Sequence, residues 1–287
     1  MERKSLNKLF NKISVLIPDE TLLKIKYRYH IGQNLNLKRP EKFTEKIQWL
    51  KLNNRKNEYV DYVDKYQVRS FIEEKIGREY LIPLIGVYEK VEHIDWESLP
   101  DKFVLKCTHG SHCNIICENK HELDIQESKK LLEKWMKRNW FWYGREWPYR
   151  NVKPRIICEK YMVDESGVEL KDYKILCFNG EPKIIQVDYD RFTNHKRNLY
   201  DTEWNYIPVS FLVPTDKKVE IKKPEKLEEM LVLAKKLSKD HPHLRVDFYS
   251  IEKNIFFGEM TFYPESGFGK FAPQEFDYKL GQLINLN

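Results

Sequence analysis

The sequence lacks any apolar run that could cross a membrane, and it lacks an apolar segment near its first residue. No stretch approaches 18 consecutive apolar residues, and the chain begins Met-Glu-Arg-Lys rather than with the apolar core of a signal peptide. Neither a membrane span nor secretion is expected, and we predict a cytoplasmic protein. The inner face of the membrane is an alternative location, because the N-terminal segment is basic.

Cysteine is scarce, and its spacing does not fit a zinc site. The five cysteines are an odd set within apolar runs, and Cys113 and Cys117 have no second Cys or His pair of the kind that a structural zinc needs. We expect buried, reduced thiols. The five are Cys107, Cys113, Cys117, Cys158 and Cys177.

A strong excess of one charge is also absent. Lysine and arginine number 50 against 44 acidic residues, a formal net charge of +6, which favours anionic ligands such as nucleotides or sugar phosphates. The basic residues are spread along the chain, with neither a zinc-finger spacing nor an RNA-recognition aromatic motif, so no nucleic acid partner is expected. The length of 287 residues suits one large domain or two or three closely packed lobes.

Helical periodicity dominates the N-terminal part of the chain. Apolar residues recur at helical spacing from Leu6 to Arg28 beside several lysines, with a break at Pro18. This pattern predicts two basic amphipathic helices. They either contact a membrane surface or a partner, or pack on the body of the protein with a solvated outer face, which is the favoured alternative. Further helical periodicity extends from Glu45 to Gly77.

Beyond Tyr80 the pattern changes to short runs of β-branched residues between turn residues, which predicts strands. Asn179-Gly180 joins two of these runs and is a strong hairpin signal. Helices are predicted at Ser128 to Lys137 and at Lys226 to Ser238. The expected strands are Leu81–Val87, Phe103–Lys106, Asn114–Cys117, Arg155–Met162, Asp172–Phe178, Ile184–Val187, Leu244–Tyr249 and Ile255–Met260.

Charged side chains alternate along the last pair of expected strands. Alternation puts Arg245 and Asp247 on one face, and Glu259 and Thr261 likewise share a face. If the register aligns these faces, two carboxylates lie beside one arginine. Paired acids on rigid strands suit Mg²⁺ that carries a nucleoside triphosphate, and the arginine could stabilise charge on a transferred phosphate. A cross-strand salt bridge on a solvated sheet face is the alternative.

Two upstream segments contain residues suited to nucleotide contact. The strand that ends at Lys106 is followed by a loop of small residues up to His112. The lysine would act as a point charge and the loop amides as phosphate donors, although the glycine spacing of a Walker loop is absent. The segment from Ile156 to Met162 is an apolar strand that runs into an acid and an aromatic residue. It fits either a hinge that reads the adenine edge or an ordinary strand.

Taken in order, these segments resemble the ATP-grasp superfamily over residues 64–273. The resemblance implies an α+β, ATP-grasp fold in which two α+β lobes sandwich ATP, with a helical N-terminal region in place of a full α/β lobe. It implies a helical region at 1–80, a lid and first nucleotide lobe at 81–165, and a metal and catalytic lobe at 166–287. The implied cofactors are ATP and one or two Mg²⁺ ions.

The resemblance also implies roles for individual residues. The lid loop is implied at residues 108–114, Asp172 would hold ribose hydroxyls, and the lysines would contact phosphate. The implied nucleotide-binding residues are Lys65, Lys106, His109, Gly110, Ser111, Glu159, Lys160, Tyr161, Met162, Asp172 and Lys174. The implied metal ligands are Asp247, Glu259 and Thr261, and the implied catalytic residues are Arg245 and Lys174.

Two positions depart from the superfamily pattern. Thr261 stands where a metal-binding asparagine is expected, so a second metal would be bound more weakly or completed by water. His112 stands in the lid loop where a second glycine is usual, which affects the expected flexibility of the lid.

Three longer strings resemble the teichuronopeptide-biosynthesis branch of the superfamily. They are Asp101 to Ser111, Lys171 to Gly180, and Gly258 to Pro264. This narrower resemblance implies a bacterial enzyme of surface-polysaccharide assembly, which activates a carboxylate as an acyl phosphate and captures it with an amine. The implied partners are a small-molecule or saccharide carboxylate and an amine.

Rival functions stay open at this point. Members of the branch are often labelled glycosyltransferases, and Asp188-Tyr189-Asp190 offers the Asp-x-Asp string that such an enzyme would use for its metal. A kinase acting on a sugar hydroxyl is a further alternative, and so is a noncatalytic binding module. The loop from Pro264 to Lys270 directly follows the second acidic strand, and we expect it to shape the acceptor pocket.

Overall fold

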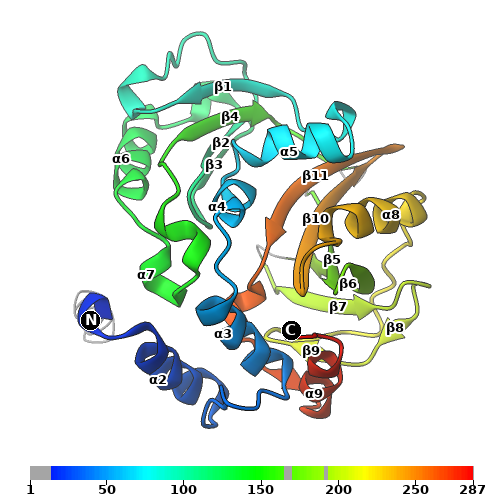
Figure 1. Ribbon diagram of the computed structural model, residues 1–287. Helices are drawn as coiled ribbons and strands as arrows, with labels where there is room; N and C mark the ends of the chain where they lie inside the picture. The colour runs from blue at the N-terminus through cyan, green and yellow to red at the C-terminus, as the bar shows by residue number, and fades with distance from the viewer. Residues whose placement is uncertain (1–13, 165–169, 191–192, 287) are drawn as a thin grey trace.

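The computed structural model describes residues 14–164, 170–190 and 193–286 (Figure 1). The first expected basic helix falls almost wholly within residues 1–13, outside the described residues. The second begins as expected after Pro18, which suits a helix start because its missing N–H would have no partner there. This helix, α2 (Asp19–Ile31), buries Leu22 and Leu23 while Lys24 and Arg28 stay exposed. None of the described helices is both long enough and apolar enough to span a bilayer.

The expected helical region from Glu45 to Gly77 is confirmed as three helices. They are α3 (Phe43–Asn53), α4 (Glu58–Val63) and α5 (Val68–Lys75). Their apolar faces join the largest core cluster of the protein, which they share with the larger sheet. Helix α3 is also tied to α9 (Glu275–Gln282), because the backbone N–H and hydroxyl of Thr44 both donate to Asp277 at 2.9 and 2.7 Å. The N-terminal helices therefore belong to the body that carries the larger sheet.

A four-stranded antiparallel sheet stands in the order β1-β4-β2-β3. Its strands are β1 (Leu84–Tyr88), β2 (Phe103–Cys107), β3 (Asn114–Cys117) and β4 (Ile156–Lys160). Phe103 and Leu105 are buried in a core cluster with Leu132 of α6 (Ile125–Met136). Alternation then turns Lys106 to the opposite face of the sheet. Helix α6 begins at Ile125, three residues earlier than expected. Asp124 caps the helix there by accepting the Glu127 N–H.

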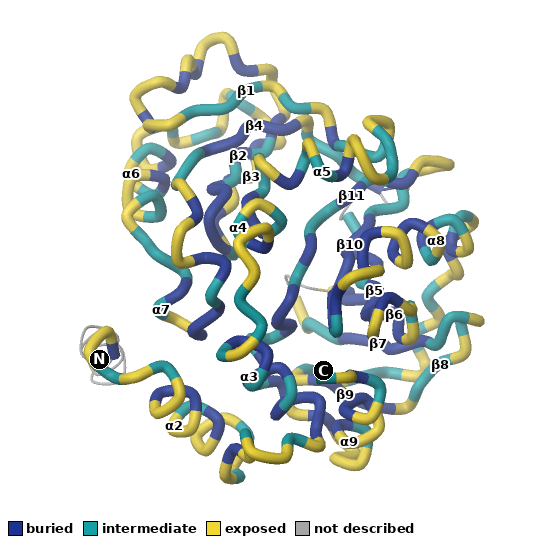
Figure 2. Tube along the Cα trace, in the orientation of Figure 1, coloured by how far each residue is buried: buried dark blue, intermediate teal, exposed yellow. Residues whose placement is uncertain are grey.

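A six-stranded sheet stands in the order β11-β10-β5-β6-β7-β8, with each neighbouring pair antiparallel. Helix α8 (Leu227–Ser238) packs on one face of this sheet (Figure 1). Its apolar residues share a core cluster with those of the central strands, which are largely buried (Figure 2). The opposite face carries the charged residues of β5 and β10. The strands are β5 (Asp172–Phe178), β6 (Glu181–Tyr189), β7 (Lys196–Tyr200), β8 (Tyr206–Ile207), β10 (His243–Ile251) and β11 (Asn254–Thr261).

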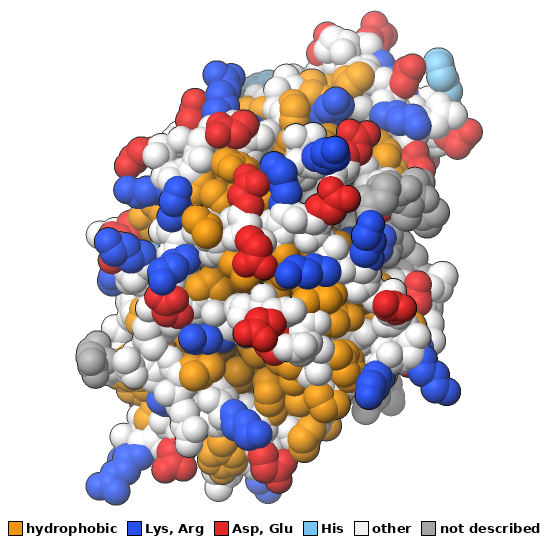
Figure 3. All heavy atoms as spheres, turned by 90° about the vertical axis from the view of Figure 1, so that its right-hand side faces the viewer, with side chains coloured by type: hydrophobic (Ala, Val, Ile, Leu, Met, Phe, Trp, Pro, Cys, Tyr) orange, Lys and Arg blue, Asp and Glu red, His pale blue; other side chains and the backbone are white. Residues whose placement is uncertain are grey.

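Smaller elements complete the described chain. A two-stranded sheet pairs β9 (Ser210–Phe211) with β12 (Phe271–Ala272), and α7 (Phe141–Gly144) precedes β4. Short 3-10 turns include one over Pro264–Gly267. All five cysteines are buried and free of disulfides, as expected. On the face that includes α8, basic and acidic side chains are interspersed, so the excess positive charge is not concentrated there (Figure 3).

The Asn179-Gly180 hairpin is confirmed as the link between β5 and β6. Both residues have positive φ, 47° and 81°, as a two-residue hairpin turn requires. A Cβ on Gly180 would lie 3.0 Å from backbone atoms of Lys239, whereas one on Gly32 (φ 87°) would meet nothing within 4 Å. We therefore expect Gly32→Ala to lose about 1–2 kcal/mol of unfolding free energy from backbone strain alone, and Gly180→Ala to lose more. Urea unfolding measures both, and equal losses would contradict the role of the Lys239 contact.

Candidate active site

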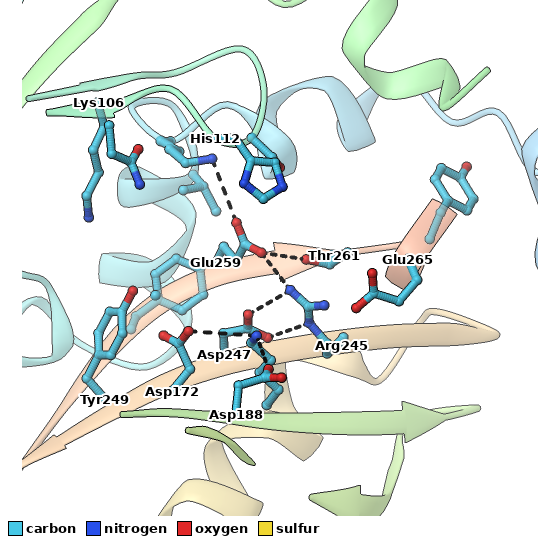
Figure 4. A pocket seen from close by; sticks show the side chains of 18 of the residues that line it. Lys106, His112, Asp172, Asp188, Arg245, Asp247, Tyr249, Glu259, Thr261 and Glu265 are labelled. Carbon is cyan, nitrogen blue, oxygen red and sulfur yellow. Dashed lines mark hydrogen bonds and ion pairs between the residues drawn. The ribbon is translucent and has the colours of Figure 1, made fainter. Parts of the chain in front are cut away.

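A cavity of about 580 Å³ lies between the two larger sheets (Figure 4). The four-stranded sheet contributes Lys106 and Glu159 to its wall, and the six-stranded sheet contributes most of the other charged side chains. Lys65 and Arg69 reach it from the segment around α5. Side chains from both sheets therefore face one space, as a ligand held between two lobes would require.

The predicted convergence of Arg245, Asp247 and Glu259 is confirmed by the register. In the β10–β11 hairpin Asp247 lies opposite Glu259, and Arg245 lies opposite Thr261. The Arg245 guanidinium donates to both Asp247 oxygens, with Nε to Oδ1 at 2.7 Å and Nη2 to Oδ2 at 2.8 Å. The same Nη2 donates to Glu259 Oε1 at 2.7 Å. Thr261 donates its hydroxyl to that oxygen at 3.0 Å (Figure 4).

The two carboxylates of this hairpin differ in their pKa and in their exposure. Burial raises the pKa of Asp247 to about 7 in spite of the neighbouring Arg245. Burial acts on Glu259 in the same direction, but the charges of Lys65 and Arg245 outweigh it and lower the pKa of Glu259 to about 2. Glu259 is also the more accessible group, with 34% of its side chain exposed against 4% for Asp247. Glu259 is therefore the anion that the cavity presents.

A second cluster lies beside the first on the same face of the sheet. Lys174 is opposite Asp247 in the pairing of β5 with β10, and its Nζ lies 2.6 Å from Asp188 and 3.8 Å from Asp172. Asp188 also accepts from Arg197 Nε at 2.7 Å and contacts His195 Nε2 at 2.9 Å. The neighbouring Asp190 is exposed. Asp188 of the Asp-x-Asp string is thus surrounded by protein donors.

Asp188→Asn is expected to destabilise the protein by about 3–5 kcal/mol at neutral pH, because Lys174 and Arg197 would lose their buried anion. Burial alone would raise the pKa of Asp188, but these two cations hold it well below its ordinary value of 3.8. A depressed folded-state pKa contributes stability that is complete above the unfolded-state pKa and is lost as the pH falls below it. Urea unfolding should therefore show a larger difference from wild type at pH 7 than at pH 3. Asp190→Asn is the matched control, and an equal loss for Asp188→Asn at both pH values would contradict the account.

The four-stranded sheet presents its own charge cluster to the cavity. Glu159 receives Lys106 at 2.8 Å on Oε2 and Arg69 at 3.0 Å on Oε1. Lys65 donates to the backbone oxygen of Gly110 at 2.9 Å and lies 3.7 Å from Glu259 Oε2. Lys65 thus connects the 108–114 loop to the β10–β11 hairpin. Lysines from three different elements thus border the space above the paired acids.

Several expected nucleotide residues do not turn their side chains into this cavity. His109 is buried with its Nε2 3.1 Å from the backbone oxygen of Trp135, and the residues of the 108–114 loop that line the cavity are Ser111, His112 and Asn114. His112 has φ 56°, a conformation that glycine adopts most easily, at the position where a glycine was expected. Lys160, Tyr161 and Met162 are also outside the lining set. Their expected contacts with adenine stay a prediction.

The donor set fits Mg²⁺ that is bound together with phosphate. Among residues 14–164, 170–190 and 193–286, no group of three or more His, Cys, Asp and Glu side chains forms a cage for a metal. Asp247 and Glu259 instead supply paired carboxylate oxygens. Mg²⁺ is usually held by one or two carboxylates plus substrate phosphates rather than by an all-protein cage. Asp247 and Glu259 would hold the ion, with Arg245 now bridging the same oxygens.

Four charged or histidine side chains of the cavity wall were not predicted from the sequence. Arg69 follows Lys65 by one helical turn, so its spacing was a usable signal. Arg197 and His195 lie at β7, whose sequence is too polar to read as a buried strand. Glu146 lies between the tryptophans that precede β4. The latter three reach the site only through tertiary packing.

Two sheets that face a cavity bordered by lysines and by paired acids are the arrangement expected of an ATP-grasp protein, and the expected α+β fold is confirmed. Residues 45–285 match the family described as TupA-like ATPgrasp. The chain belongs to this family, which confirms both the resemblance and the expected class of ATP-dependent ligase. No curated protein matched the sequence.

Solved structures of several ligases are similar at low identity. The D-alanine–D-alanine ligase of Bacillus anthracis, complexed with ATP, is 14% identical over 70% of this chain and 53% of that one, with a TM-score of 0.39. The Helicobacter pylori D-alanine–D-alanine ligase is 14% identical over 85% and 70%, with a TM-score of 0.41. Phosphoribosylamine–glycine ligase of Thermotoga maritima is 14% identical over 73% and 50%, also at 0.41. The chain thus spans about half the length of two of these three ligases.

Proposed function

We propose that the protein is an ATP- and Mg²⁺-dependent carboxylate-amine ligase, which forms an amide through an acyl phosphate and releases ADP and phosphate. The observation that carries this proposal is the bridge from Arg245 to both Asp247 and Glu259 within a cavity that Lys65, Lys106 and Lys174 also border. Paired acids suit a metal with phosphates, and the lysines offset the charge of a triphosphate.

Each charged group has a distinct part in this reaction. Lys65, Lys106 and Lys174 bind the phosphate groups of ATP, and Asp247 and Glu259 hold Mg²⁺. When bound, Mg²⁺ supplies charge neutralisation between the phosphate oxygens. Arg245 now donates to the two carboxylates at 2.7–2.8 Å. It would exchange these contacts for oxygens of the phosphoryl group and steady that group during transfer.

The chemistry proceeds in two displacements. An oxygen of the substrate carboxylate attacks the γ-phosphorus of ATP, the bond to the bridging oxygen breaks, and ADP leaves with that electron pair. The nitrogen of the amine then attacks the acyl carbon, the bond from that carbon to the phosphate oxygen breaks, and phosphate leaves. Positioning and electrostatics are sufficient for both steps, so no covalent protein nucleophile is needed.

For the substrates, we propose a uronic acid as the carboxylate and an amino acid or other amine as the acceptor, in the assembly of a bacterial surface polysaccharide. This part of the proposal is supported by membership of the TupA-like family and by the three strings that resemble the teichuronopeptide-biosynthesis branch. The Pro264–Gly267 turn supports an acceptor pocket, because Glu265 reaches Arg197 Nη1 at 2.9 Å in the cavity wall.

The rival glycosyltransferase would need the Asp-x-Asp string for its metal. Asp188 is instead surrounded by Lys174, Arg197 and His195, and Asp190 is exposed after it. A cation there would have to displace several protein donors. A metal at Asp188, which the glycosyltransferase would need, is therefore less favoured than a metal at the more exposed Glu259.

An ADP-release assay tests the proposed function. The purified protein is incubated with Mg·ATP, with D-glucuronate or D-galacturonate as the acid, and with each of the common amino acids as the amine. Stimulation of ADP and phosphate release that needs both an acid and an amine supports ligation. Phosphate retained on the sugar with no need for an amine would identify a kinase. Consumption of a sugar nucleotide without ATP would identify a glycosyltransferase.

A further inference from the structure

Glu146 is a carboxylate in the cavity wall whose charge the mechanism above does not use. It is only 7% exposed and lines the same cavity as Arg245 and Glu259. The charges of Glu259 and Arg245 are close enough to influence it. Among the described residues it has no ion pair within 4 Å, in contrast to Asp188, Glu159 and the hairpin acids, and the charge of Lys51 reaches it through Ser266 rather than by direct contact.

Lys51 stands behind this carboxylate and is completely buried. Its ammonium donates to the backbone oxygens of Gly144 and Ser266 at 2.8 and 2.7 Å, and to Ser266 Oγ at 2.9 Å. Ser266 is in turn hydrogen-bonded to Glu146. Because a buried cation is stable only when its charge is compensated, Glu146 is the acid that this arrangement requires, linked to Lys51 through one hydroxyl.

The backbone around Ser266 is held in an unusual conformation. Glu265 and Ser266 both have left-handed φ values, 49° and 52°, which cost free energy in non-glycine residues and are characteristic of functional sites. Gly144 permits the close approach, since a Cβ there would lie 2.1 Å from Ser266 Oγ and 2.9 Å from Glu146 Oε1. Three segments that are distant in sequence are thus packed tightly in order to hold one carboxylate at the cavity wall.

We propose that Glu146 accepts the proton of the attacking amine, that Lys51 positions it through Ser266, and that this part of the cavity is the subsite for a primary amine. The inference rests on the proposed ligase function and adds the residue that makes the second displacement possible. Glu146 stands near Arg245 and Glu259, where the acyl phosphate would form. Because no cation is paired directly with it, it can receive an ammonium group without first losing another partner.

The proton balance of the step is complete. The amine arrives as an ammonium ion and transfers one proton to a Glu146 carboxylate oxygen, which frees the nitrogen lone pair. That lone pair forms the bond to the acyl carbon, and the bond from carbon to the phosphate oxygen breaks as phosphate leaves with the electrons. Of the two protons left on the nitrogen, one is lost to the departing phosphate and the other remains as the amide N–H, and Glu146 returns its own proton to solvent.

The protonation of the buried pair agrees with this role. Burial raises the pKa of Glu146 and lowers that of Lys51 to about 7. A carboxylate with a raised pKa is a stronger base, and a base works best when its pKa is near the working pH. Perturbed acid and base groups that adjoin a cleft are candidates for a functional site.

The test compares two nucleophiles on wild type and Glu146→Gln. Hydroxylamine is uncharged at neutral pH and attacks an acyl phosphate without needing a base, so hydroxamate formation with ATP and D-glucuronate or D-galacturonate reports the first displacement alone. An amino acid needs the base. We expect Glu146→Gln to form hydroxamate as wild type does and to form the amide about 10²–10⁴-fold more slowly, with partial recovery in Glu146→Asp. Glu133→Gln, at an exposed position of α6, controls for the loss of one negative charge.

The outcomes distinguish a failure of the proposed ligase function from a failure of the proposed role of Glu146. No hydroxamate from wild type with either acid would overturn the ligase function and the role of Glu146 with it. Hydroxamate from wild type with no amide from any amino acid would overturn the amine subsite. Equal amide rates in wild type and Glu146→Gln would overturn the base while leaving the ligase intact. Loss of both products in Glu146→Gln would show a structural role, which also overturns the base.

Discussion

Glu259→Gln is expected to slow ATP turnover by about 10²–10³-fold, the scale of losing one preorganised electrostatic group in an active site. Glu259 is the accessible anion of the hairpin, and its pKa of about 2 keeps it charged at any working pH. Glutamine keeps the size of the side chain and one oxygen but removes the charge that would hold Mg²⁺. ADP release with the acid and amine that stimulate wild type measures the effect.

Glu252→Gln is the matched control for this prediction. Glu252 lies in the turn of the same β10–β11 hairpin and is exposed, so its loss changes the charge of the hairpin equally without touching the cavity. Wild-type turnover is expected for Glu252→Gln. Turnover that stays at the wild-type rate in Glu259→Gln, or that falls equally in both variants, would remove Glu259 from the metal site.

Arg245→Met is expected to make the thermal stability of the protein depend on Mg²⁺. The variant leaves Asp247 and Glu259 opposite each other without the guanidinium that bridges them, a loss of about 3–5 kcal/mol for a broken buried pair. Mg²⁺ can then bind between the two carboxylates without displacing a cation. Ligand binding to the folded state raises its stability, so added Mg²⁺ should raise the Tm of Arg245→Met by more than that of wild type.

Arg197→Met serves as the control for the magnesium effect. It also removes a buried arginine from a carboxylate, but Asp188 keeps Lys174 at 2.6 Å. We expect a lower Tm that Mg²⁺ does not restore. A similar response to Mg²⁺ in both variants would mean that the ion binds nonspecifically, and no response in Arg245→Met would contradict a metal site at Asp247 and Glu259.

The β10–β11 hairpin could be predicted from the sequence because its information is local. Period-two alternation fixes which side chains of one strand share a face. The turn alone, however, would set Asp247 opposite Gly258. A β-bulge between Asp247 and Phe248 shifts the register and brings Glu259 opposite Asp247, and the sequence does not fix that shift. The same alternation put Lys174 beside Asp172, which the structure bears out at 3.8 Å. The partner of Lys174 at 2.6 Å is Asp188, on the next strand across. That contact depends on the pairing of β5 with β6, and therefore on the hairpin at Gly180.

Arg197 and Glu146 could not be predicted, because tertiary contacts alone give them their places. Arg197 is on β7, a strand with a polar sequence that exists because β6 offers an unpaired edge. The position of Glu146 depends on Lys51 and Ser266, which approach from opposite ends of the chain. For the expected hinge, the strand was predicted but the direction of its side chains was not. Of the hinge residues, alternation along β4 turns only Glu159 toward Lys106.

Transfer of oxygen from the carboxylate to phosphate tests the central claim most directly. The reaction is run with an acid labelled with ¹⁸O in its carboxyl group, and the released phosphate is analysed by mass spectrometry. Because the carboxylate oxygen that attacks ATP leaves with the phosphate, a fully labelled acid should give one ¹⁸O in every phosphate released. Phosphate without label, formed while the acid is consumed, would contradict the acyl phosphate and the ligase function that rests on it.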